Sequence, residues 1–115
     1  MALMHAAQNH FNQGLLNQAA QLCQQVLQIS PDHAPAMHTL GLIAYQQGAT
    51  DSALQLLKQA VKRQPRVASY LSNLGILYNN TGQPQQAIEH YQRALALEPN
   101  CVEFPNNLGV TYLHL

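Results

Sequence analysis

One interval runs through this chain: residues of the same type return every 34 positions. Six columns share that interval, and each holds a single kind of small, apolar or turn-forming residue. The columns are Pro31, Pro65 and Pro99; Gly14, Gly48 and Gly82; Gly41, Gly75 and Gly109; Ala19, Ala53 and Ala87; Ala60 and Ala94; and Leu40, Leu74 and Leu108. Columns in one register indicate a repeat architecture, in which each unit buries its apolar face against the next.

The residues between the columns favour helices. Alanine, leucine and glutamine dominate, and all three are good helix formers, whereas aromatic residues make up only 6% of the chain. Leu74, Gly75 and Tyr78 form an apolar stripe at helical spacing, and so do Ala87, Tyr91 and Ala94. The pattern predicts helices at residues 2–13, 17–29, 35–47, 51–63, 69–80, 84–97 and 103–115.

Glycine and proline mark where these helices end. Gly48 and Gly82 follow the first helix of a unit, where glycine adopts a left-handed conformation at little cost. Pro65 and Pro99 stop the second helix. We also expect Gly41 to face Ala53, and Gly75 to face Ala87, so that the two helices of a unit approach closely.

The interval and its residue types resemble the tetratricopeptide repeat, most closely in the segment LSNLGILYNNTGQPQQAIEHYQRALALEP at residues 71–99. The resemblance covers the whole chain and implies units at about 1–32, 33–66 and 67–100, with a partial unit at 101–115. Unit one departs from the pattern at Ala7 and His10. The implied fold is all-α: one domain forming a right-handed α-solenoid of antiparallel helix pairs, three repeats plus the first helix of a fourth. The apolar last helix suggests a fragment of a longer protein.

In that architecture the first helices line the concave face, so the resemblance implies that partner-binding residues lie there. Amide and hydroxyl side chains stand beside an apolar stripe on these helices, and amides pair readily with the backbone of an extended peptide. We therefore expect a protein or peptide partner. The candidate contact residues are Gln8, Phe11, Asn12, His38, Thr39, Leu42, Tyr45, Gln46, Ser72, Asn73, Ile76, Asn79, Asn80, Asn106, Asn107 and Val110.

Other functions lack their signals. Formal net charge is +0 and only 9% of residues are charged, which argues against nucleic acid as a partner. All lysines and arginines fall on or after second helices, so the carboxylate clamp of chaperone-binding repeats is not expected. The histidine pairs are five residues apart rather than four, and no catalytic motif occurs, so we expect no metal, cofactor or catalytic residue. Cys23 and Cys101 are expected to be buried or incidental free thiols. Without a signal peptide or membrane span, we expect a cytoplasmic protein.

Two further roles stay open beside the interaction scaffold. The segments HTLGLIAYQQG and SNLGILYNNTGQPQQAIEHYQRALALEP look like the repeat arms of bacterial O-linked N-acetylglucosamine-transferase-like proteins. In that family an asparagine ladder holds substrate peptide; Asn73 and Asn107 match its column, whereas His5 and Thr39 do not. The other role is self-assembly. The uncapped apolar helix at 103–115 is expected either to pair with another copy or to fray.

Overall fold

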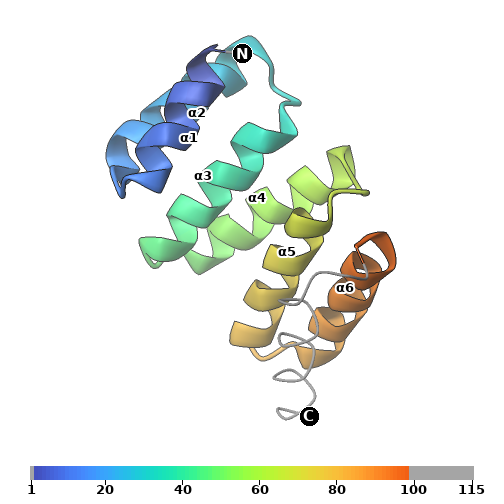
Figure 1. The fold of residues 1–115 in the computed structure, drawn as a ribbon. Helices are drawn as coiled ribbons and strands as arrows, with labels where there is room; N and C mark the ends of the chain where they lie inside the picture. Colours follow the sequence, from blue (N-terminus) through green and yellow to red (C-terminus); the bar gives the residue numbers. More distant parts are fainter. Residues whose placement is uncertain (1, 99–115) are drawn as a thin grey trace. The chain divides into compact units, whose positions relative to one another are not determined.

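A computed structural model describes residues 2–98. They form antiparallel helix pairs with no strand among them (Figure 1). The helices are α1 (Ala2–Asn12), α2 (Leu16–Ile29), α3 (Ala34–Gln46), α4 (Thr50–Arg63), α5 (Ala68–Asn80) and α6 (Pro84–Leu97). Their bounds lie within about two residues of those predicted. The helices make two compact units, α1–α4 in residues 1–63 and α5–α6 after residue 63. The prediction of an all-α helical repeat is confirmed, whereas its right-handed stacking, its single domain and its last helix at 103–115 stay predictions.

Each helix pair closes through the same turn. Gly14, Gly48 and Gly82 have φ of +79°, +84° and +77°, the left-handed region that costs other residues strain. The residue after each glycine donates its N–H to the carbonyl five positions earlier: Leu15 to His10 at 2.9 Å, Ala49 to Ala44 at 2.9 Å and Gln83 to Tyr78 at 2.8 Å. This bond satisfies a carbonyl that the end of a helix would leave unpaired. The role predicted for Gly48 and Gly82 is confirmed, and Gly14 adopts the same conformation.

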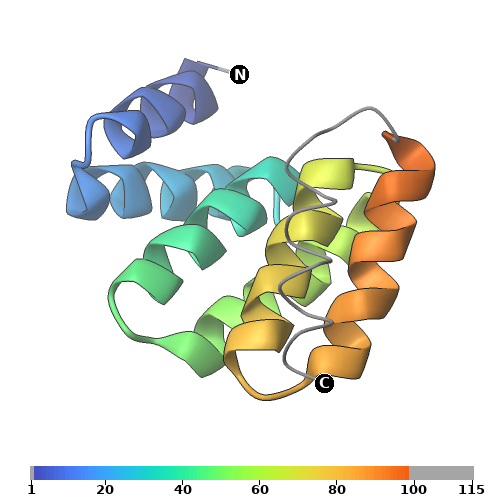
Figure 2. The same cartoon turned by 60° about the horizontal axis from the view of Figure 1, so that its bottom comes forward.

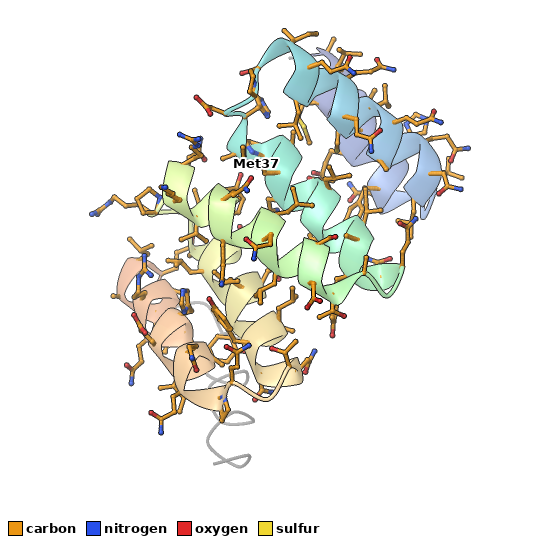
Figure 3. The ribbon with its side chains drawn as sticks, turned by 180° about the vertical axis from the view of Figure 1, so that it is seen from behind. Met37 is labelled. Atoms are coloured by element: carbon orange, nitrogen blue, oxygen red, sulfur yellow. The ribbon has the colours of Figure 1, made fainter. Side chains whose placement is uncertain are left out.

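The core of the first unit lies where α3 packs against α1, α2 and α4. Ala7, Cys23, Val26 and Ala36 are fully buried there, with the leucines of α1, α2 and α3 around them. Met37 of α3, labelled in Figure 3, is also buried. Burial raises the pKa of the Cys23 thiol to about 11, because the charged thiolate loses its hydration. Cys23 is thus a buried free thiol, as expected.

In the second unit, a large side chain rather than a small one covers the glycine of the first helix. A methyl group on Gly75 would lie 2.5 Å from Cε1 of Tyr91, whose side chain is 2% exposed. Gly41 in the first unit likewise faces Leu56 and Leu57, at 3.2 Å. The expected pairing of Gly75 with Ala87 and of Gly41 with Ala53 is therefore wrong by one helical turn. Each glycine is a recess that a side chain of the partner helix fills.

Two polar residues at the junction between repeats hold the start of α3 and the end of α4. Nδ1 of His33 accepts a hydrogen bond from the backbone N–H of Ala36 at 3.2 Å, so this histidine caps α3. Asp32, just before it, pairs with Arg63 at 3.0 Å. Both charged side chains are largely exposed, so the ion pair contributes little stability.

Candidate protein-binding surface

The candidate residues that the structure describes lie on the first helices of the pairs. Those on α1 and α3 belong to the first unit, and those on α5 belong to the second. The exposed ones are Gln8, Asn12, Gln46 and Asn80, and the half-buried ones are Phe11, His38, Leu42, Tyr45, Asn73, Ile76 and Asn79. Asn106, Asn107 and Val110 lie outside the described residues. A groove that continues through every first helix stays a prediction.

Hydrogen bonds bring three of these residues together in the first unit. The Thr39 hydroxyl donates to Oε1 of Gln8 at 3.3 Å, and Nε2 of Gln8 donates to Oδ1 of Asn12 at 3.2 Å. Thr39 is only 3% exposed, so its hydroxyl lies beneath the surface and orients the amides above it. The prediction that Thr39 itself contacts a partner is therefore corrected: Thr39 holds Gln8, and Gln8 and Asn12 present their amides to solvent.

The link between Thr39 and Gln8 gives a measurable coupling. In a double-mutant cycle of Thr39→Val and Gln8→Ala, we expect a coupling energy of about 0.5–1 kcal/mol, since one partly buried hydrogen bond is lost in either single variant. Urea denaturation of the four proteins measures it. The exposed bond from Nε2 of Gln47 to Oδ1 of Asn17, at 3.4 Å, supplies the control, and its coupling should be near zero. Equal coupling in both cycles would contradict the role given to Thr39.

The imidazole of His38, next to Thr39 on α3, stays neutral. Burial lowers its pKa from 6.5 to about 4, because the charged form loses hydration. At neutral pH this side chain therefore adds no charge to the α3 surface. His33, five residues before it, uses its ring to cap the helix. Neither histidine of this pair is placed as a typical metal ligand, and no group of three potential ligands gathers among residues 2–98.

On α5 the candidates divide between surface and core. Asn73 and Asn79 are half-buried and Asn80 is exposed, with the apolar Ile76 between them along the helix. Ser72 is only 3% exposed, and no buried side-chain nitrogen or oxygen of the described residues lacks a hydrogen-bond partner. Ser72 is thus a satisfied core residue, which corrects its place among the contact residues. The α5 surface combines three amides with one aliphatic side chain.

None of the described first helices carries a lysine or arginine, so their surface is uncharged apart from any histidine that becomes protonated. Hydrogen bonding by amides and burial of aliphatic or aromatic side chains are what such a surface offers a ligand. No helix between residues 2 and 98 combines the length and hydrophobicity that crossing a bilayer requires.

Helix pairs that recur every 34 residues, each closed by a left-handed glycine, define a helical repeat module. Residues 10–74 and 68–101 match the tetratricopeptide repeat family. The chain belongs to that family. A search of curated protein sequences found no match.

Three solved structures illustrate the similarity of fold. A mutant of the Thermobaculum terrenum O-GlcNAc transferase is 34% identical to this chain, with a TM-score of 0.91. The match covers 96% of the present chain and 21% of the transferase chain. The present chain thus spans about a fifth of that enzyme's length. MamA is 22% identical with a TM-score of 0.87, covering 96% and 65% of the two chains. The first repeat domain of Spaghetti (RPAP3), bound to an HSP90 peptide, is 20% identical with a TM-score of 0.90, covering 97% and 89%.

Proposed function

We propose that this chain is a protein-interaction module that binds an extended segment of a partner protein on the faces of its first helices. Membership of the tetratricopeptide repeat family makes a scaffold for protein interaction the general function. The observation that supports the finer proposal is that the first helices of each unit, taken by itself, carry amides. Gln8 and Asn12 on α1, with Asn73 and Asn80 on α5, combine donors and acceptors that suit a peptide backbone.

The absence of charge on these helices narrows the class of peptide. In the Spaghetti (RPAP3) structure the bound peptide, SRMEEVD, contains three acidic residues. The described first helices of the present chain offer no lysine or arginine to such a ligand. Leu42 and Ile76 stand beside the amides and favour aliphatic side chains instead. The preferred ligand for this surface is therefore a neutral segment that carries spaced apolar residues.

A second candidate function follows from the similarity to the O-GlcNAc transferase, which is 34% identical to this chain. A repeat module of this kind could serve as the arm that recruits protein substrates to a catalytic domain elsewhere in a longer chain. The 34% identity and the asparagine at position 73, which matches the ladder column of such arms, support this candidate. The sequence that follows Leu115 in the gene discriminates it from the pure scaffold.

The first-helix surface can be tested with selected peptides. Phage display of unstructured peptides on the whole chain supplies a ligand, and titration calorimetry then compares the wild type with Asn73→Ala, Asn80→Ala and both together. Each lost amide removes hydrogen bonds worth about 0.5–1.5 kcal/mol, so the double variant should bind roughly ten-fold more weakly. Asn107→Ala, in the same column as Asn73, extends the series.

The matched control is Gln85→Ala, which removes an exposed amide from α6, a second helix. This variant should bind as the wild type does, and circular dichroism should show unchanged helicity throughout. Full affinity in the Asn73 and Asn80 double variant, or an equal loss in the Gln85 variant, would place the site on another face.

A further inference from the structure

A second surface of the chain is built differently from the first helices. The start of α5 and the end of α6 lie at the same end of this antiparallel pair (Figure 2), and an open hollow of about 190 Å³ lies there. Two arginines and four apolar residues line it: Pro65, Arg66, Leu71, Arg93, Ala96 and Leu97. None of them is among the candidate contact residues of the first helices. The hollow is therefore a separate feature of the second unit.

Among residues 2–98, no acidic side chain pairs with the two arginines of this hollow. The ion pair between Arg63 and Asp32 lies in the first unit. The acidic residues between 64 and 98 are Glu89 and Glu98, and neither lines the hollow or pairs with Arg66 or Arg93. Both arginines are exposed to solvent. Within the described residues, two exposed arginines beside an apolar wall thus lie without a carboxylate partner, and this arrangement favours an anionic ligand.

The lining selects the kind of anion. An arginine presents several N–H donors in a plane and suits a carboxylate, which it binds with two parallel hydrogen bonds. The half-buried Leu97 and the exposed Pro65 offer aliphatic contacts beside these charges, whereas Leu71 is fully buried and lies beneath the surface. Two cations are too few for the phosphate backbone of a nucleic acid, and the volume is smaller than the roughly 300–1,000 Å³ of common small-molecule pockets. The space suits one or two side chains of a protein.

We propose that this hollow binds an acidic side chain and a neighbouring aliphatic side chain on an extended segment of a partner protein. The carboxylate lies between Arg66 and Arg93, and the aliphatic group lies against Leu97 and Pro65. The chain then has two contact surfaces of opposite chemistry, an uncharged one on the first helices and a cationic one at this end of α5 and α6. A partner is recognised most tightly when it carries both kinds of segment.

The test uses the whole chain and a synthetic octapeptide of alternating glutamate and leucine, capped at both ends and labelled for fluorescence anisotropy. Its matched control replaces every glutamate with glutamine. We expect the acidic peptide to bind at least about ten-fold more tightly than the amide peptide, and to weaken as salt is added. Arg66→Gln and Arg93→Gln should each lower affinity about three- to ten-fold. Asn73→Ala should leave binding of this peptide unchanged, which separates this site from the first-helix surface.

Lys58→Gln is the charge-matched variant, because it removes one positive charge from α4, outside the hollow. It should change affinity by less than about two-fold. Three outcomes would overturn the proposal: equal binding of the two peptides, an equal loss in Lys58→Gln and the arginine variants, or displacement of the acidic peptide by inorganic phosphate at the same anion concentration. The last result would show a simple anion site. Circular dichroism of every variant ensures that the losses do not reflect unfolding.

Discussion

Gly75→Leu should lower the free energy of unfolding by about 3 kcal/mol or more, the upper end of the cost of overpacking a close helix contact. Even a single methyl group at this position would lie 2.5 Å from Cε1 and 2.7 Å from Cδ1 of the Tyr91 ring. Tyr91 is 2% exposed, so its ring has little room to move aside. Leucine adds three more carbon atoms to this conflict, and α5 and α6 must separate to accept it.

A graded series tests whether the contact with Tyr91 is the cause. Gly41→Ala meets leucine side chains at 3.2 Å, a milder contact, and alanine gains about 1 kcal/mol of helix propensity over glycine. Gly41→Ala should therefore be nearly neutral, Gly75→Ala destabilising, and Gly75→Leu the most severe. Urea and thermal denaturation followed by circular dichroism measure the series. Combining Gly75→Leu with Tyr91→Val should recover part of the loss. A shift in Tm for Gly75→Leu no larger than that for the exposed Gln85→Ala would show that the recess is misassigned.

We also expect the free energy of unfolding to fall in acid because of His38. Burial lowers the pKa of this side chain from 6.5 to about 4, so between these values the unfolded chain binds a proton that the folded chain does not. The free energy of unfolding therefore falls as pH falls through this window, and the loss is complete below about pH 4. A depression of this size corresponds to roughly 2–3 kcal/mol, which is a large share of the stability of a small domain.

The measurement compares urea denaturation of the wild type and of His38→Gln at several pH values from neutral to about 4. The difference between the two proteins isolates the contribution of His38. The wild type should lose about 2–3 kcal/mol more than the variant across the window. His5→Gln, at an exposed position on α1, should keep the full pH dependence. Parallel curves for the wild type and His38→Gln would contradict the burial of this imidazole.

The sequence predicted the helices and their turns well because both are local. Helix bounds follow from the apolar period and from glycine and proline, and left-handed glycines were predicted correctly at positions 48 and 82. The residues that face Gly41 and Gly75 across the helix pair were not predicted correctly. Which residue of one helix faces a given residue of another depends on the crossing geometry of the two helices, and the repeat interval does not encode it.

The candidate surface shows the same limit. The prediction that partner-binding residues lie on the first helices depended on the family resemblance. In the structure, the amides of these candidate residues lie on α1, α3 and α5. That Thr39 and Ser72 are buried could not be read from their columns, because an equivalent position in a neighbouring repeat can be exposed. His33 as a helix cap was also missed, although a polar residue just before a helix with Pro35 in its first turn was an available signal. The hollow at Arg66 and Arg93 joins residues 27 positions apart, which no single motif spans.

The three turns at Gly14, Gly48 and Gly82 bear on how an array of this kind changes in length. Each turn is closed by a hydrogen bond across five residues, and the three bonds are themselves offset by the repeat interval. A duplication or deletion of 34 residues can begin and end at the same position of two repeats. Every remaining turn then keeps its own glycine and its own closing hydrogen bond. Such a chain can therefore grow or shrink by whole units through single genetic events, and the geometry of its helix pairs does not have to be reinvented.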